Sequence, residues 1–244
     1  MGTLLKVTDL KKDNIIKNIS FEMPEGEMTA IVGPSGSGKS TLLYNVSGMD
    51  TPDGGKVFLK DTEITALDED GKAGLRLNRV GFVFQKMNML SNLSIIENIV
   101  FPAVHIDGRQ KKEYYGRAMK LMEDLHIADI AGRRIKEVSG GELQRACICR
   151  SLILNPDIIF ADEPTGALNR SSAGEVMESF LKINGAGTGI LMVTHDSRVA
   201  SMCERIIYLL DGEIRGEMRL GKYDPGCGRE REGRTVEWLG SMGW

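Results

Sequence analysis

Short apolar runs along the chain predict buried strands, and segments with helical spacing lie between them. Met28–Val32 lies between the polar segment Glu25–Glu27 and Gly33, a glycine-rich turn follows it, and Ser40–Val46 has a helical pattern. Further strands are predicted at Gly81–Phe84, Ile158–Ala161, Ile190–Thr194 and Arg205–Leu210. Further helices are predicted at Gln110–Leu125, Gly141–Leu154, Ser172–Lys182 and Arg198–Cys203. This alternation predicts an α/β fold with a mostly parallel sheet.

The alternation stops between about Lys86 and Val138, where helical patterns dominate. We interpret residues from about 86 to 155 as a helical subdomain inserted in a single domain of residues 1–220. The tail, residues 221–244, is rich in glycine and charge and predicts a loose C-terminal extension. It holds Trp238 and Trp244, which suit either an anchor on a partner or membrane surface, or ordinary packing of a terminal element.

Composition narrows the class of protein. The 244 residues carry 31 Lys and Arg against 34 Asp and Glu, a formal net charge of −3. We therefore expect no nucleic acid as a partner, because proteins that bind it usually carry a basic excess. No apolar run approaches the roughly 18 residues of a membrane span, and the N-terminus lacks the layout of a signal peptide. These features predict a globular, cytoplasmic protein.

The turn after the first predicted strand has the pattern of a phosphate-binding loop. It fits GxxxxGK[ST] between a strand and a helix, with the sequence Gly33-Pro34-Ser35-Gly36-Ser37-Gly38-Lys39-Ser40. Glycines let backbone N–H groups turn toward an anion, and the next helix directs its positive end at the same phosphates. Lys39 can reach the β- and γ-phosphates of a nucleotide, and the hydroxyl of Ser40 can bind Mg²⁺. An accidental match is the weaker interpretation, because the strand and the helix lie where the motif needs them.

Polar side chains end three other predicted strands. Asp162 and Glu163 follow the strand at 158–161, and ligands of open α/β sheets bind at such carboxyl ends. Asp162 suits the metal-associated aspartate of a nucleotide hydrolase, and Glu163 can orient or deprotonate a water. His195 can donate a hydrogen bond to a γ-phosphate, and the amide of Gln85 can reach Mg²⁺ or the water. Taken singly, a solvated carboxylate pair, a structural histidine and an ordinary glutamine would be simpler interpretations.

A second helix start also has the features of an anion site. Ser139 and Glu142 are three residues apart, as in a capping box. Gly140 and Gly141 follow the cap directly, and glycine is costly inside a helix. Close approach of this backbone to another group therefore explains the two glycines better than helix initiation alone. A phosphate would suit the position.

Five elements together resemble the nucleotide-binding subunit of ABC transporters. They occur in that family's order: GPSGSGKST (33–41), Gln85, VSGGELQR (138–145), IIFADEP (158–164) and His195. The resemblance implies a P-loop NTPase core of ABC type, a helical subdomain and a small antiparallel β part near the N-terminus. It implies ATP and Mg²⁺ as cofactors, with Ser40, Gln85 and Asp162 at the metal and Glu163, His195 and Gln85 in catalysis. The nucleotide-binding residues that it implies are Gly33 to Ser40, Thr41, Ser139, Gly140 and Gly141.

The resemblance also implies partners. ATP would lie between the loop of one copy and the Ser139 segment of a second copy, in a head-to-tail homodimer. Gln85 would link the nucleotide to a membrane permease, and a short cytoplasmic helix of the permease would dock on the helical subdomain. The chain would then contact the membrane's inner face only through that permease. Met87 and Met89, which follow Gln85, suit either core filling or a pliable docking groove.

More narrowly, ADEPTGALN (161–169) resembles the branch serving macrolide efflux, lipoprotein release and bacitracin or lantibiotic resistance. Within that branch, Asn169 and the tail at 236–240 favour antimicrobial-peptide resistance systems. We therefore expect export or removal of an antimicrobial peptide, a drug or a lipid-linked substrate. The alternative is an ATPase that signals to a membrane partner, or controls it mechanically, without moving a solute. A DNA-repair or translation ATPase and a small-molecule kinase fit the motifs less well.

Two departures from the family's pattern stand out. The family usually has an aromatic residue near the N-terminus that stacks on adenine, and Leu10–Asn14 offers none. Either base selectivity is weak or an aliphatic residue such as Ile15 covers the ring. In addition, Asn169 stands where the family usually has Asp, and this change could alter communication between the two ATP sites.

Overall fold

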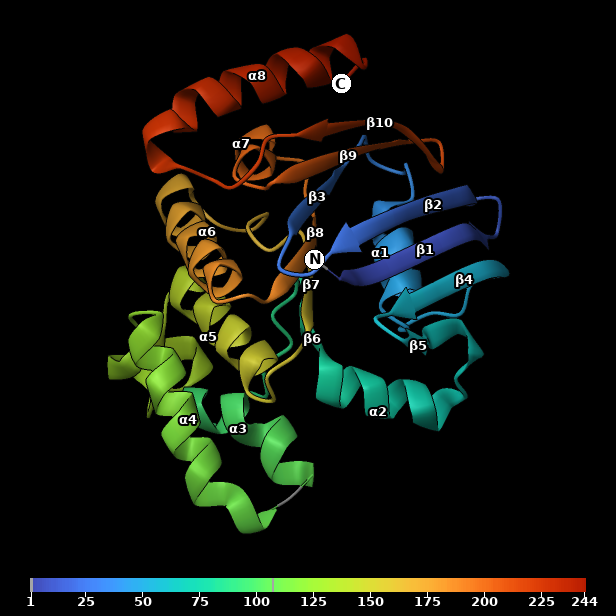
Figure 1. Cartoon of the computed structure of the whole chain (residues 1–244). Helices are drawn as coiled ribbons and strands as arrows, with labels where there is room; N and C mark the ends of the chain where they lie inside the picture. Colours follow the sequence, from blue (N-terminus) through green and yellow to red (C-terminus); the bar gives the residue numbers. More distant parts are fainter. Residues whose placement is uncertain (1, 107) are drawn as a thin grey trace.

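The fold is built on a six-stranded sheet with the order β10-β9-β3-β8-β7-β6. The computed structural model describes residues 2–106 and 108–244 (Figure 1). All neighbouring strands of this sheet are parallel except β10, which runs antiparallel to β9. The strands are β3 (Met28–Val32), β6 (Val80–Val83), β7 (Ile158–Asp162), β8 (Gly189–Val193), β9 (Arg205–Leu210) and β10 (Glu213–Arg219). The predicted α/β fold with a mostly parallel sheet is confirmed.

A smaller, antiparallel sheet lies beside it, with the order β2-β1-β4-β5. Its strands are β1 (Thr3–Lys12), β2 (Ile16–Pro24), β4 (Gly54–Leu59) and β5 (Thr62–Glu63). This is the small N-terminal β part that the family resemblance implied. Figure 1 shows α1 between the two sheets and α2 below the smaller one.

Helices cover the large sheet and form a separate arm. In Figure 1, α3, α4 and the end of α5 project below the sheets, while α6 and α7 lie closer to the strands. The helices are α1 (Lys39–Val46), α2 (Glu69–Arg79), α3 (Ile95–Ile106), α4 (Lys111–Asp124), α5 (Gly140–Leu152), α6 (Arg170–Gly185), α7 (Ser197–Ser201) and α8 (Gly228–Ser241). Short 3₁₀ turns occur at Ile64–Ala66, Gly108–Gln110, Ala128–Ile130, Ile135–Glu137 and Pro225–Cys227. The helices and strands expected from the sequence all form, with ends within about three residues of the expected ones.

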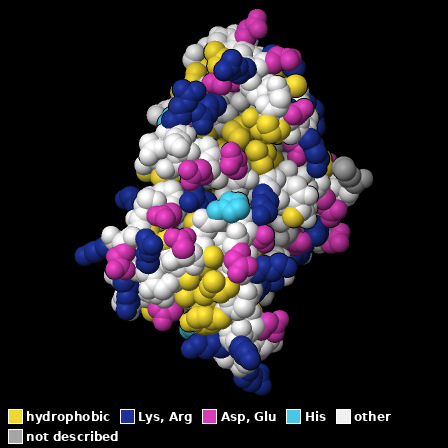
Figure 2. Space-filling view, turned by 90° about the vertical axis from the view of Figure 1, so that its left-hand side faces the viewer, with side chains coloured by type: hydrophobic (Ala, Val, Ile, Leu, Met, Phe, Trp, Pro, Cys, Tyr) yellow, Lys and Arg dark blue, Asp and Glu magenta, His cyan; other side chains and the backbone are white. Residues whose placement is uncertain are grey.

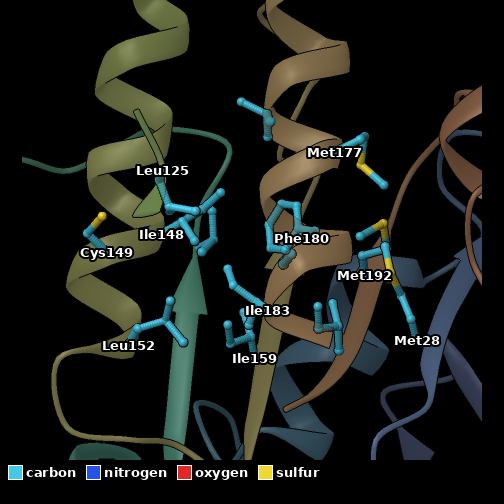
Figure 3. Packing of buried hydrophobic residues seen from close by; sticks show 14 of the residues in the cluster. Met28, Leu125, Ile148, Cys149, Leu152, Ile159, Met177, Phe180, Ile183 and Met192 are labelled. Carbon is cyan, nitrogen blue, oxygen red and sulfur yellow. The ribbon is translucent and has the colours of Figure 1, made fainter. Parts of the chain in front are cut away.

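The central strands are buried on both faces, which explains their continuous apolar runs. Alternate residues enter different clusters: Ile159 and Met192 pack under the helices, whereas Phe160 and Leu191 face α1 and the small sheet. Figure 3 shows the helical side, where Phe180 of α6 lies among residues from α5 and the strands. The carboxyl ends of the strands are therefore fixed by core packing on two sides.

The C-terminal tail differs from the sequence-based expectation. Its residues form α8, which runs along β10 at the top of Figure 1, so the prediction of a loose extension is wrong. Leu239 is buried, and Trp238 makes an edge-to-face contact with Tyr208 of β9. Trp244 also lies near that ring, with 6.1 Å between centroids. The structure thus favours ordinary packing for Trp238, while Trp244 contacts the same ring and stays 42% exposed.

The surface carries both signs of charge. Figure 2 shows Lys, Arg, Asp and Glu interspersed on the face where α4, α5 and α6 lie, with hydrophobic side chains gathered in small patches between them. Within residues 2–106 and 108–244, no helix has the length and hydropathy needed to cross a bilayer.

Candidate functional site

The loop between β3 and α1 has the backbone geometry of an anion site. Gly36 and Gly38 have φ angles of 82° and 97°, in the left-handed region that favours glycine. A Cβ on Gly33 would lie 2.0 Å from the carbonyl oxygen of Leu209 at the end of β9, so a side chain has no room there. Gly38 is the N-cap of α1 and offers no side chain to the first N–H groups of the helix. Those N–H groups are therefore available to a phosphate.

Lys39 lies folded across this loop. Its Nζ donates hydrogen bonds to the carbonyl oxygens of Gly33 (2.8 Å) and Pro34 (3.0 Å). Partial burial lowers the pKa of Lys39, and the nearby carboxylates of Glu163 and Asp162 oppose that shift. The ammonium group thus sits beside the loop and the two carboxylates, where it can exchange carbonyl oxygens for phosphate oxygens.

Asp162, at the end of β7, is tied to α1 through both carboxylate oxygens. Ser40 Oγ donates to Oδ1 at 2.9 Å, and Tyr44 Oη donates to Oδ2 at 2.7 Å. Burial, followed by the hydrogen bond to Asp162, raises the pKa of Tyr44 to about 12, so the phenol stays a donor at neutral pH. Ser40 and Asp162 are both expected at the metal from the family resemblance, whereas Tyr44 was not singled out from the sequence pattern. Its position four residues after Ser40, on the same helix face, was the available signal.

Glu163 and His195 meet next to this group. His195 Nδ1 lies 2.9 Å from Oε2 of Glu163, within ion-pair distance, yet that buried oxygen has no hydrogen bond of good geometry. The two groups are in contact, and the oxygen can still accept a hydrogen bond. Glu163 has a φ of 47°, which is uncommon for a residue with a side chain. Gln85 is exposed, and its Nε2 lies close to Gly166 in the turn after Glu163.

These residues fit Mg²⁺ bound together with a nucleotide. Magnesium prefers oxygen ligands, and Ser40 and Asp162 place a hydroxyl and a carboxylate 2.9 Å apart. Among the described residues, no group of three or more His, Cys, Asp or Glu could hold a metal ion. Protein sites for Mg²⁺ commonly use one or two carboxylates plus substrate phosphates, so phosphate oxygens would complete this one.

The Ser139 segment has a complete cap at the start of α5. Ser139 Oγ and the backbone N–H of Ser139 both donate to Oε2 of Glu142 at 2.7 Å, and Glu142 N–H donates back at 3.3 Å. The predicted capping box is confirmed. A Cβ on Gly141 would lie 2.9 Å from Cβ of Ser172, so packing against α6 explains this glycine without a ligand. Ser139 and Gly140 are exposed.

The loop after Glu163 reaches the same region. Leu168 lies beside Gly140, 3.2 Å from where a Cβ would sit. The next residue, Asn169, caps α6, and its side-chain oxygen accepts a hydrogen bond from Ser172 N–H at 2.9 Å. Asparagine supplies this acceptor as aspartate would, so the departure from the family's Asp preserves the helix cap.

Ile15 lies against the phosphate loop. Its Cγ2 is 3.1 Å from the position of a Cβ on Gly38, and 42% of the residue is exposed. An aliphatic surface therefore borders the loop on the side of the antiparallel sheet.

The sequence and the fold are similar to those of known proteins. A family model described as "ABC transporter" matches residues 16–166. The lipoprotein-releasing system ATP-binding protein LolD of Aquifex aeolicus is 40% identical over 222 residues, covering 89% of this chain and 99% of LolD. The macrolide export ATP-binding/permease protein MacB of Campylobacter jejuni is 41% identical over 214 residues, covering 88% of this chain and 33% of MacB. The chain thus spans about one third of the length of the macrolide export proteins that it matches.

A solved structure agrees with these matches. The cassette MJ0796, described as a dimeric bacterial ABC transporter cassette, is 35% identical with a TM-score of 0.81, covering 90% of this chain and 100% of that one. The same cassette has been solved in a post-hydrolysis state bound to ADP and Pi. The resemblance drawn from the five sequence elements is confirmed. The chain belongs to the ABC transporter family and is an ATP-binding cassette, an ATPase, of the branch that includes MacB and LolD.

Proposed function

We propose that the cassette pairs head-to-tail with a second copy, hydrolyses MgATP at the shared interface and drives a membrane permease. One observation carries this proposal: the chain has two helix N-termini suited to phosphate, and they face different neighbours. The loop of α1 contacts Leu209 and Asp162, whereas the α5 start contacts Leu168 and Ser172. The exposed α5 start is therefore free to meet a nucleotide held by another copy. The dimer described for MJ0796 supports this arrangement.

The loop and its neighbours would bind the triphosphate. Lys39 would exchange the carbonyl oxygens of Gly33 and Pro34 for phosphate oxygens, while the N–H groups at the start of α1 hold the phosphates. Ser40 and Asp162 would hold Mg²⁺, with Gln85 near the same edge. A metal held there would neutralise negative charge on the phosphates of the nucleotide.

Glu163 would act on the attacking water. Its carboxylate is mostly buried beside His195, and its Oε2 can accept a hydrogen bond from a water. His195, 65% exposed at its side chain, can turn its ring toward a γ-phosphate while remaining near Glu163. Glu163 would thus orient the attacking water, and His195 would sense the γ-phosphate by contacting it.

Mixing two inactive variants tests the head-to-tail pairing. Lys39→Ala removes the loop's cation, and Ser139→Phe blocks the other half of the site, so each variant alone should lose ATPase activity. A heterodimer would hold one intact site, built from the loop of one chain and the Ser139 segment of the other. Random mixing should recover about a quarter of wild-type activity. If the mixture stays inactive although the two chains co-elute, the head-to-tail site is wrong.

A groove between the core and the helical arm suits the permease. It has a volume of about 400 Å³, and Leu77, Leu90 and Phe101 in its lining are each at least 38% exposed. The lining includes two basic residues, Arg76 and Arg150, and no acidic one. We infer that its occupant is a short permease helix with an apolar face and a carboxylate. The two methionines that the sequence suggested for such a groove are not in its lining.

A matched pair of substitutions on one helix tests the groove. Phe101→Ser should weaken co-purification with the permease at least tenfold, because an exposed aromatic side chain leaves the interface. Ile106→Ser removes a similarly exposed apolar side chain outside the groove lining and should leave association unchanged. Equal effects of both substitutions would contradict the docking site.

The transported molecule is proposed from the relatives and from the sequence. The names MacB and LolD refer to macrolide export and lipoprotein release, which favours a drug or a lipid-linked substrate, while Asn169 and the tail at 236–240 favour an antimicrobial peptide. The cassette would be held at the cytoplasmic face of the membrane by its permease.

The alternative function is an ATPase that controls a membrane partner without moving a solute. Flux measured in vesicles with the reconstituted complex decides between them, since only transport needs ATP-dependent movement of substrate.

A further inference from the structure

The carboxylate of Asp162 is held by one face of α1 at both of its oxygens. Ser40 and Tyr44 are four residues apart on that helix, so their side chains point the same way. The two hydrogen bonds, 2.9 Å to Oδ1 and 2.7 Å to Oδ2, fix the plane of the carboxylate relative to the helix. Asp162 is 7% exposed, so water has little access to replace either bond.

The ring of Tyr44 is itself held in place. Its centroid lies 5.9 Å from that of Phe82 of β6, and Phe82 stacks on Phe84 at 4.2 Å. Phe82 also lies 6.4 Å from Phe160 of β7, two residues before Asp162. The phenol hydroxyl therefore sits at the end of a packed aromatic group, which restricts its movement. This packing makes Tyr44 a fixed donor.

We propose that Tyr44 is a positioning residue for the magnesium site: it holds Oδ2 of Asp162 so that Oδ1 stays aimed at Ser40 and the metal. The final torsion of an aspartate side chain is broad, so one hydrogen bond alone leaves the carboxylate free to turn. With the phenol in place, Oδ2 is occupied, and Oδ1 is the oxygen that the carboxylate would present to a metal. Partners of this kind, which orient a ligand without touching the metal, typically change metal affinity 10- to 100-fold. The inference rests on the proposed use of Ser40 and Asp162 for Mg²⁺.

Metal binding without turnover provides the test. Mn²⁺ is titrated into the full chain with the non-hydrolysable analogue AMP-PNP, and free Mn²⁺ is followed by electron paramagnetic resonance. Tyr44→Phe keeps the ring and removes only the hydroxyl, and it should raise the dissociation constant for Mn²⁺ about tenfold. AMP-PNP affinity in excess EDTA should stay within twofold of wild type, because the metal is then absent. Tyr115→Phe, a half-buried tyrosine on α4, is the matched control and should change neither value.

Two results would overturn the inference, and a third variant separates it from the proposed function. Unchanged Mn²⁺ affinity in Tyr44→Phe would show that the phenol does not position the carboxylate. An equal loss of AMP-PNP affinity with and without metal would show that it acts on the nucleotide loop instead. Asp162→Asn should weaken Mn²⁺ binding more than Tyr44→Phe does. If Asp162→Asn has no effect, the magnesium assignment itself fails; if it has an effect and Tyr44→Phe has none, only the present inference fails.

Discussion

His195 Nδ1 lies 2.9 Å from Oε2 of Glu163, so the polar residues at the ends of the neighbouring strands β8 and β7 are in direct contact. The contact exists within one chain, before any second copy supplies its Ser139 segment. One half of the proposed hydrolytic site is therefore already assembled by the parallel sheet. The other half depends on association.

Replacing Glu163 by glutamine should stop hydrolysis while preserving binding. The amide keeps the size of the side chain but cannot accept a proton, so steady-state ATPase activity should fall about 10²- to 10⁴-fold. ATP affinity should stay near wild type, and size-exclusion chromatography with MgATP should show an accumulated dimer. Glu178→Gln, an exposed position on α6, is the control and should retain activity. Near-normal turnover in Glu163→Gln would exclude the residue as the base.

Backbone strain at Glu163 leads to a stability prediction. Its φ of 47° lies in the left-handed region, where a side chain costs about 1 kcal/mol relative to glycine. Glu163→Gly should therefore be about 1 kcal/mol more stable than Glu163→Ala in urea unfolding without nucleotide, although both variants lose the carboxylate. Comparing these two variants removes the electrostatic change from the difference. Equal unfolding midpoints would show that the turn stores no such strain.

Two features made part of the site predictable from the sequence: the local motif of the phosphate loop and the topology of the parallel strands. The phosphate loop depends on glycines within one short segment, and parallel strands must bring their carboxyl ends to one edge of the sheet. These two facts place Ser40 next to Asp162 and Glu163 next to His195. Tyr44 was missed because an aromatic residue among apolar neighbours on a helix normally indicates core packing. Its ring does pack in that way, and only the hydroxyl reaches the site.

The C-terminal helix was missed for a different reason. Its buried face is formed by Arg231, Thr235 and Leu239, spaced by four residues, and two of these three are polar. A helix whose buried face is polar lacks the hydrophobic periodicity on which helix prediction depends. Arginine can occupy such a position only where enough acceptors surround it.

An aromatic side chain at position 15 should strengthen nucleotide binding. Ile15 lies beside Gly38 and offers an aliphatic surface where the family usually stacks an aromatic ring on adenine. Base stacking on an aromatic ring contributes about 1–3 kcal/mol, so Ile15→Tyr should tighten ATP binding about fivefold or more and raise its preference over pyrimidine triphosphates. Titration calorimetry with ATP and CTP measures both. Val236→Tyr, at an exposed apolar position on α8, is the control. Unchanged ATP affinity in Ile15→Tyr would place the base away from this residue.

We expect the stability of the C-terminal helix α8 against the core to depend on Arg231. Its guanidinium is buried and donates to five backbone carbonyl oxygens, at distances from 2.8 to 3.2 Å; these belong to Ser201, Cys203, Leu220, Gly221 and Lys222. Ser201 is the last residue of α7, the short helix after His195, and Cys203 follows it, so one side chain joins α8 to the segment that leaves the proposed site. Arg231→Ala leaves these acceptors without their donor and opens a cavity, which should lower the free energy of unfolding by at least about 3 kcal/mol.

The control is Arg234→Ala, at an exposed position one turn further along α8, which should change the free energy of unfolding by less than about 0.5 kcal/mol. Urea unfolding followed by tryptophan fluorescence measures both, since Trp238 and Trp244 lie on or next to this helix. If the two variants unfold at the same urea concentration, the hydrogen bonds of Arg231 contribute no more to stability than an exposed arginine does.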